Sequence, residues 1–193
     1  SADALLYLRR AQNPDGGFGA ARGRSSTPLY SAWATMALAA AGVKPWTARK
    51  GGSTAAFRVA QDARRVTSVG DMERTLLALR ASRGSTARLA ARLRKAQKAD
   101  GSFSSLVNLT AFGILALRAA GDTPTSPAIR RAGNWLVRQP TEDGGFSYTG
   151  PNGSTTIDDT AAALQALQAA GQGETPVAAR ALRYLEDAPH SQQ

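Results

Sequence analysis

Apolar and basic positions alternate along the chain with the spacing of amphipathic helices. In segment 85–96, Leu89, Leu93 and Ala96 follow one another at i, i+4 and i+7 and so share one helical face. Arg88 and Arg92 lie on another face. The pattern predicts a helix with one buried side and one basic, solvent-facing side.

The next segment, from Leu106 to Ala120, is apolar nearly all round, which predicts a helix buried on most sides. Asp100 and Gly101 separate it from the preceding helix. Glycine tolerates a positive φ and aspartate can cap backbone donors, so this pair predicts a sharp turn. The second helix ends at Gly121, a typical residue after a helix C-terminus.

This helix–turn–helix pattern repeats along the chain. A glutamine, a short spacer and Asp-Gly-x-Phe occur three times, and their residues are Gln12, Asp15 and Phe18; Gln97, Asp100 and Phe103; and Gln139, Asp143 and Phe146. Glycines 42, 84, 121 and 171 end the second helices. We therefore predict units at about 1–42, 43–84, 85–121 and 122–171 and a half-unit at 172–193.

The second unit departs from the pattern. Gln61 stands at the expected glutamine position, but Arg64, Arg65 and Val66 replace the Asp-Gly-x-Phe segment. With no linker-like stretch in 193 residues, we predict one all-α domain, 1–193, built from helical hairpins. Its apolar second helices are expected inside and its basic first helices outside.

Composition narrows the function. The net charge of +10 is carried mostly by arginine and admits polyanions of any kind, from nucleic acid to anionic lipid or acidic polysaccharide, although no specific nucleic-acid motif is present. The simpler explanation is a coding bias toward Arg and Ala and a soluble surface. No apolar run approaches the roughly 18 residues of a membrane span. Because Ser1 is preceded by neither Met nor an apolar signal region, we expect that processing or design removed what came before.

The turns resemble the QW motif of the prenyltransferase and squalene oxidase repeat, which builds the α/α toroids of terpene cyclases. Phe18, Phe103 and Phe146 stand where cyclases often carry Trp. The resemblance implies that the motif glutamine bonds to the end of a neighbouring helix and stacks on the ring. Closed members use about six hairpins, whereas four and a lone helix from Thr175 to Asp187 are counted here. We therefore expect an α/α toroid that is partial or complete: open, truncated or completed by another chain.

The segment Thr156-Ile157-Asp158-Asp159-Thr160-Ala161 resembles the DxDDTA motif of squalene-hopene and class II diterpene cyclases. The resemblance implies that Asp158 is the Brønsted acid and Asp159 its neighbour. The first aspartate of the motif is Thr156 here. A carboxyl that protonates an alkene must be kept protonated by burial and oriented hydrogen bonds, so this replacement weakens the assignment.

The repeats offer a structural explanation of the same residues. Counted from the terminal glycines, Leu29, Asp71 and Asn108 correspond to Asp158. An acid or amide at the start of three second helices favours a helix cap. Asp159 has no acidic counterpart in this count. The residues that correspond to Thr160 are Ser31, Glu73 and Thr110.

The candidate ligand-binding residues come from the second helices and are Tyr30, Trp33, Asp71, Asn108, Phe112 and Thr156. Carbocation cyclases line their cavities with aromatic faces, and three rings are few for a polycyclisation. They suffice to bind a small apolar ligand, unless they only pack in the core.

Other chemistries lack the necessary residues. The chain has no Cys, and its one His is His190 in a polar tail, so the zinc site of prenyltransferases cannot form. We expect no metal and no cofactor. Glycan cleavage by paired carboxylates has only Asp71, Asp158 and Asp159 to draw on. The segment 148–155 is the longest loop between helices and is either a binding loop or a plain insertion.

The sequence thus favours a non-catalytic binding module of a larger protein, with a small apolar ligand, an anionic polymer or a protein as the partner. Analogy with family members places that protein outside the cell or at its surface. A cyclase-like enzyme that uses Asp158, and a fragment of a larger helical toroid, are the alternatives.

Overall fold

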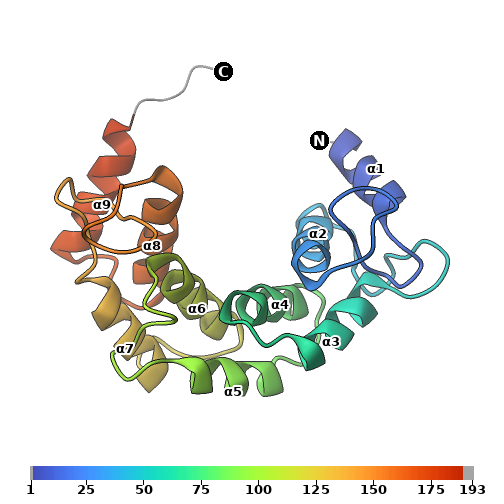
Figure 1. The fold of residues 1–193 in the computed structure, drawn as a ribbon, viewed down its shortest axis with the longest axis horizontal. Helices are drawn as coiled ribbons and strands as arrows, with labels where there is room; N and C mark the ends of the chain where they lie inside the picture. Colours follow the sequence, from blue (N-terminus) through green and yellow to red (C-terminus); the bar gives the residue numbers. More distant parts are fainter. Residues whose placement is uncertain (1, 189–193) are drawn as a thin grey trace. The chain divides into compact units, whose positions relative to one another are not determined.

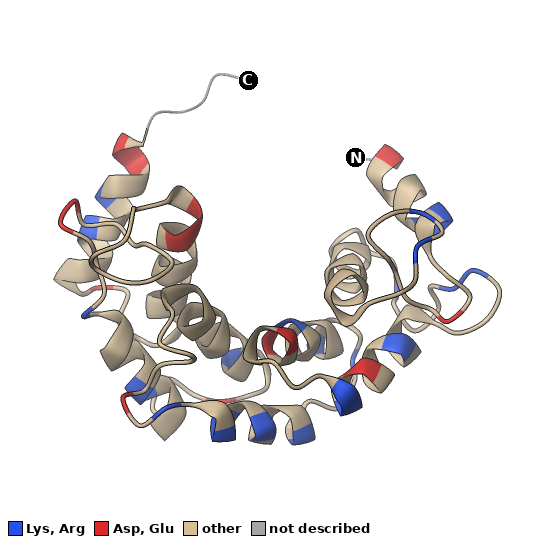
Figure 2. Ribbon diagram, viewed as in Figure 1, with Lys and Arg blue, Asp and Glu red and all other residues tan. Residues whose placement is uncertain are grey.

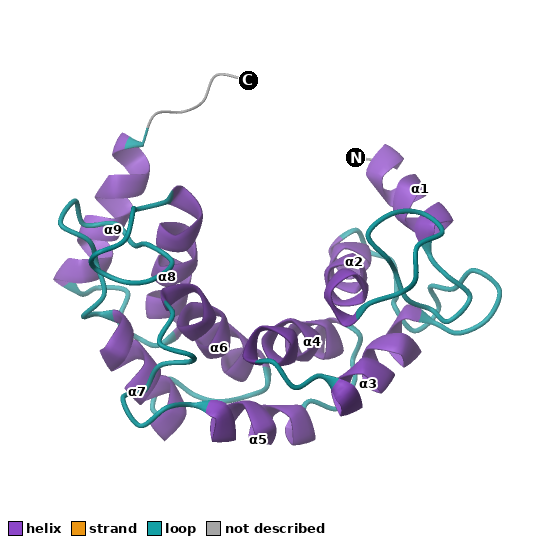
Figure 3. Ribbon diagram, viewed as in Figure 1, coloured by secondary structure: helices purple, strands orange, loops and turns teal. Residues whose placement is uncertain are grey.

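The computed structural model describes residues 2–188, and over that range its regular secondary structure is helical, apart from two isolated β-bridges (Figure 1, Figure 3). His190 lies outside the described residues. The helices are α1 (Ala2–Ala11), α2 (Pro28–Ala40), α3 (Ala55–Arg65), α4 (Val69–Ala81), α5 (Ala87–Ala96), α6 (Val107–Ala119), α7 (Pro127–Leu136), α8 (Ile157–Ala169) and α9 (Pro176–Asp187).

The chain divides into two compact units, 1–92 and 93–193, with the division inside α5. In the first unit, α2 packs against α4, α3 packs on both of them, and α1 packs on α2. In the second unit, α6 packs against α8, α7 contacts both, and α9 packs on α8. Each unit thus repeats the same arrangement, with second helices side by side and first helices laid against them.

The helices begin where the sequence supplies caps. Thr27, Thr54, Ser68, Thr156 and Thr175 each accept the backbone N–H three residues ahead. Helix α6 has Leu106 at its N-cap and no side-chain cap. Its first N–H, from Val107, instead donates to the carbonyl oxygen of Tyr148 at 3.0 Å. The long loop between α7 and α8 therefore completes the start of α6.

The core consists of the facing sides of the second helices and the phenylalanine side chain of each Asp-Gly turn. Leu38 and Leu76 are fully buried in the first unit, as are Leu117 and Leu167 in the second. Phe18, Phe103 and Phe146 are also buried. Leu115 and Leu164 are half-buried.

The three Asp-Gly turns are built alike. The Oδ1 atoms of Asp15, Asp100 and Asp143 accept the backbone N–H two residues ahead, at 3.0, 2.9 and 3.1 Å. The N–H of each following phenylalanine donates to a hydroxyl in the first turn of the next helix, and these hydroxyls belong to Ser31, Thr110 and Thr160. The turn therefore fixes where the second helix begins.

The glutamine prediction is wrong for the last copy. The Nε2 atom of Gln12 donates to the carbonyl oxygens of Gly16 and Ala48, and that of Gln97 donates to those of Gly101 and Ala128, all at 2.9–3.0 Å. Gly16 and Gly101 lie in the same turn as the glutamine. Ala48 lies before α3, and Ala128 lies at the start of α7. Within residues 2–188, Gln139 donates only to Trp135 O, in the helix that precedes it, at 3.3 Å. The spacing explains the difference, because Gln139 precedes its aspartate by four residues and the other two by three.

The repeat register predicted for the second unit is also wrong, by one residue. The αL residue that ends α4 is Arg83, with φ 57°, whereas glycines 42, 121 and 171 take that place elsewhere. Counted from Arg83, Asp71 corresponds to Asp159, which therefore has an acidic counterpart. Gln61 lies within α3, and Arg92 donates instead to the carbonyls of Ala63 and Val66 at the end of that helix.

Basic side chains are frequent on α3 and α5, as Figure 2 shows, but they are not confined to the first helices. Arg74 and Arg80 lie on α4, and Arg118 lies on α6. Among the described residues, no helix is both long and apolar enough to cross a membrane.

Candidate functional site

Two aspartates, Asp158 and Asp159, lie in the first turn of α8, and Asp159 is the one whose carboxylate accepts hydrogen bonds from neighbouring side chains. It is 7% exposed, and its Oδ2 accepts the Thr156 hydroxyl at 2.8 Å while its own N–H donates back to Thr156 Oγ1 at 3.0 Å. Asn108 Nδ2 donates to the other oxygen at 3.4 Å. Asp159, Thr156 and Asn108 thus form one reciprocal helix cap that reaches across to α6.

Asp158, the residue expected to act as an acid, is exposed in the first turn of α8. The described residues around Asp158 therefore do not supply the burial that a Brønsted acid toward an alkene requires.

Helix α4 carries the same cap in the first unit. The Ser68 hydroxyl donates to Asp71 Oδ2 at 2.7 Å, and Arg74 donates to Oδ1 at 2.8 Å. Partial burial of Asp71 favours its neutral form, but the Ser68 and Arg74 hydrogen bonds and the Arg74 charge prevail and hold the pKa of its carboxyl below the ordinary value. Asp71 is therefore a charged cap residue.

Glu73 is the strongly perturbed group that sequence reasoning missed. It is 1% exposed on α4, and its Oε1 has no hydrogen-bond partner within the described part of the chain. Burial raises the pKa of its carboxyl to about 9, and the charge of Arg74 offsets only part of that effect. In the corrected register its counterparts are Ala32, Ala111 and Ala161, so an acid among alanines was the available signal.

An apolar pocket brings Tyr30 and Trp33 together in the first unit. The pocket lies between α1 and α2 and has a volume of about 280 Å³; Tyr7, Leu8 and Phe18 are among its other lining residues. Trp33 is 46% exposed and Tyr30 40% exposed. Phe112, on α6 in the second unit, is half-buried and does not line this pocket. Nothing in the sequence pointed to Tyr7, because its place depends on how α1 packs.

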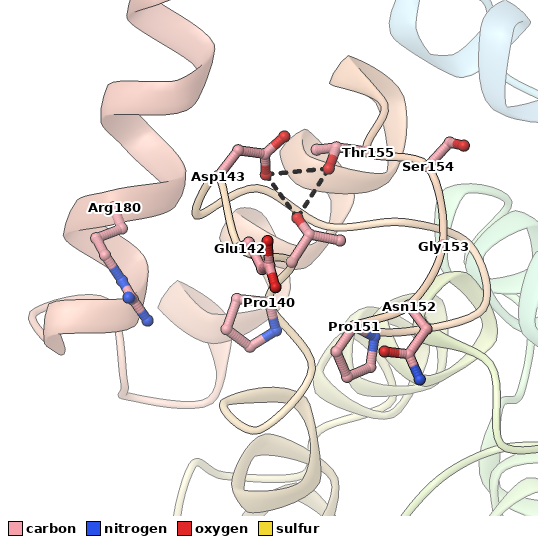
Figure 4. A pocket seen from close by; sticks show the side chains of 10 residues that line it. Pro140, Glu142, Asp143, Pro151, Asn152, Gly153, Ser154, Thr155 and Arg180 are labelled. Carbon is pink, nitrogen blue, oxygen red and sulfur yellow. Dashed lines mark hydrogen bonds between the residues drawn. The ribbon is translucent and has the colours of Figure 1, made fainter.

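The long loop before α8 borders a second, polar pocket, which lies wholly in the second unit. Its walls are residues 140–143, residues 151–155 and Arg180 of α9, around about 840 Å³ of open space (Figure 4). Asp143 faces the loop there and accepts from Thr141 at 2.7 Å and from Thr155 at 3.0 Å. These contacts tie the loop to the Asp-Gly turn. No group of three or more His, Cys, Asp or Glu suited to a metal occurs among residues 2–188.

Comparison with known proteins identifies the family. The sequence model of the squalene-hopene cyclase C-terminal domain matches residues 66–192. The chain belongs to this family. The chain is 37% identical over 111 residues to a probable squalene–hopene cyclase of Sinorhizobium fredii, and the match covers 50% of the chain and 17% of that protein. It is 34% identical over 108 residues to a squalene–hopene cyclase of Bradyrhizobium diazoefficiens, covering 48% and 16%.

The fold agrees with the family. A solved structure of ent-copalyl diphosphate synthase from Streptomyces platensis superposes with a TM-score of 0.74 over 98% of this chain and 40% of that one, at 22% identity. The predicted relation to terpene cyclase-type helical repeats is thus confirmed. The aligned part is about a sixth of the length of the curated relatives, so their whole-protein activities are not carried over by the match.

Proposed function

We propose that the chain is a non-catalytic binding module of a larger protein and that it holds a small apolar, isoprenoid-like ligand between α1 and α2. The observation that carries the proposal is the pocket lined by Tyr7, Tyr30 and Trp33. The placement of that larger protein outside the cell or at its surface stays a prediction.

The exposure of these rings supports a binding role. Tyr7 is 55% exposed, and a group of large, half-exposed aromatic side chains around one hollow is more typical of a binding surface than of a core. Ala34 and Ala37 of α2 also line the pocket, and their small side chains leave room beside the rings. A volume of about 280 Å³ lies just below the usual range for ligand pockets, about 300–1,000 Å³, which suits a short ligand.

The positions of three carboxyl groups support a non-catalytic role. Asp158 is exposed, and Asp159 is occupied by Thr156 and Asn108. Glu73 is the described carboxyl with a strongly raised pKa, and it does not line the apolar pocket. An acid must reach the reacting atom, so none of the three supports proton transfer to a ligand there.

The test is titration calorimetry with geraniol, a short isoprenoid alcohol. Wild-type protein should bind it saturably, and Trp33→Ala and Tyr30→Ala should each weaken binding by about tenfold, since each removes apolar surface that the ligand would bury and a loss of about 1.4 kcal/mol is tenfold. Phe57→Ala is the matched control, because Phe57 is an exposed ring of the same unit that does not line the pocket. Equal binding by all four proteins would refute the proposal.

Family membership favours one second candidate, a cyclase-like enzyme that uses Asp158. That alternative requires turnover of squalene or a diterpene diphosphate, detected as cyclic products by mass spectrometry, and its loss in Asp158→Asn. Our proposal expects no product from either protein. The third possibility, a fragment of a larger toroid, fits the 40% coverage of the structural neighbour and is compatible with a binding role in the assembled protein.

A further inference from the structure

A second small pocket of the first unit is lined by arginine and by no acid. It has a volume of about 270 Å³ and lies between the end of α1, the end of α2 and the loop that follows. Arg9 and Arg49 supply its charge, and the half-buried Val43 supplies apolar surface. Neither guanidinium makes an ion pair within the described part of the chain. The pocket shares no residue with the one between Tyr30 and Trp33.

The hairpin that begins with α5 has the same local frame, which fixes the correspondence between residues. Gln12 and Gln97 make the same pair of Nε2 hydrogen bonds, and Arg9 and Arg94 each lie three residues before them. Arg9 and Arg94 are therefore equivalent positions.

The residues that follow the two second helices also correspond to each other. Val43 and Asp122 each follow a glycine with positive φ at the end of the second helix. The N–H of Val43 donates to Leu38 O at 2.9 Å, and that of Asp122 donates to Leu117 O at 3.0 Å. Val43 and Asp122 are therefore equivalent as well.

In the α5–α6 hairpin, the arginine of this pair of positions binds the carboxylate at the other position. The Asp122 carboxylate accepts two hydrogen bonds from Arg94, from Nε at 3.0 Å and from Nη2 at 2.6 Å, in the bidentate geometry that guanidinium favours. In the first hairpin valine replaces the aspartate, and a cavity remains beside Arg9. Arg49, on the loop that follows α2, adds a second guanidinium.

We propose that this cavity binds the phosphate group of a small phosphate monoester, in the position that the Asp122 carboxylate takes in the later hairpin. Two guanidiniums favour a ligand close to a double negative charge, and a phosphate monoester carries about −1.5 to −2 at pH 7. Val43, which is half-buried beside the cavity, accepts a short alkyl group attached to it. The site requires neither the aromatic pocket nor an enzymatic activity.

Titration calorimetry of the full chain at fixed ionic strength, with butyl phosphate, inorganic phosphate and pentanoate as probes, tests the proposal. Butyl phosphate should bind saturably and most tightly. Arg9→Ala and Arg49→Ala should each weaken its binding at least tenfold. Val43→Asp should abolish it, because the new carboxylate pairs with Arg9 as Asp122 pairs with Arg94.

Arg10→Ala is the matched control, since Arg10 is an exposed neighbour that does not line the pocket, and its binding should stay within twofold of wild type. The proposal is overturned if Arg10→Ala loses as much affinity as Arg9→Ala, which would indicate only the diffuse field of a basic protein. It is also overturned if pentanoate binds as tightly as butyl phosphate, or if Arg9→Ala and Arg49→Ala bind like wild type. Circular dichroism of each variant ensures that a loss does not come from misfolding.

Discussion

Single residues at equivalent repeat positions have diverged in ways that reveal their environment. Glu73 stands where the other units have alanine, and Val43 stands where the α5–α6 hairpin has Asp122. The backbone frame is kept at both places, so the side chain alone decides whether the position is apolar, charged or neutralised by burial. The buried acid is the case whose consequence for stability can be worked out from its pKa.

We predict that Glu73 makes the protein less stable as pH rises. Its folded-state pKa of about 9 lies above the ordinary 4.5, so between those values the folded chain holds a proton that the unfolded chain releases. The contribution of Glu73 to the free energy of unfolding should therefore be largest below about pH 4.5 and fall until about pH 9. Glu73→Gln should remove much of this slope and stabilise the protein at pH 8.

Urea denaturation followed by far-UV circular dichroism at pH 5, 7 and 8.5 measures the effect. Asp158→Asn, which removes an exposed carboxyl, is the matched control for the loss of one acidic group. Parallel pH profiles of Glu73→Gln and wild type would contradict the prediction, because they would mean that Glu73 is ionised in the folded state.

At the level of elements, the Asp-Gly turn is the feature that positions the second helix of a hairpin. Its aspartate fixes the turn, its phenylalanine enters the core, and the phenylalanine N–H anchors the next helix. The pKa of Asp100 is lowered chiefly by the backbone N–H of Ser102, and that of Asp143 chiefly by the Thr141 hydroxyl. Both turns therefore lose support when the pH falls below the ordinary aspartate value of 3.8.

Close approach of the turn to the following helix predicts a strong effect of Gly101→Ala. Gly101 has φ +96°, and a Cβ there would lie 2.3 Å from the carbonyl oxygen of Arg131. Gly121 has φ +106° but no heavy atom within 4 Å of the same position. Gly121→Ala should lower the free energy of unfolding by about 1 kcal/mol through backbone strain alone, and Gly101→Ala should lower it by clearly more.

Both glycines lie in the second unit, so urea titrations of the two variants compare the losses in the free energy of unfolding directly. Equal losses in the two variants would mean that the turn and α7 do not approach closely in solution. The comparison does not depend on any ligand.

The sequence predicted the helical hairpins of the whole molecule because their signals are local: apolar periodicity, Asp-Gly turns and terminal glycines. It failed where a different residue took over a role. Arg83 adopts the left-handed conformation that glycine was expected to supply, which shifted the register and separated Asp71 from its true counterpart Asp159. No local pattern distinguishes an arginine of that conformation from its neighbours.

The candidate sites were less predictable than the fold. Tyr30 and Trp33 are three residues apart on one helix, so their shared face could be read from the sequence. Tyr7 and Arg49 reach their pockets from other segments, through packing between elements that no periodicity encodes. The aspartate pair suggested chemistry by its motif, whereas its geometry is that of a helix cap.

Hydrogen exchange of the full chain with and without saturating geraniol tests most directly whether the chain is a binding module with its site between α1 and α2. Binding should slow amide exchange in peptides that cover residues 2–11 and 28–40 and leave those around α8 unchanged. Protection centred on the start of α8, or no protection anywhere, would contradict the account.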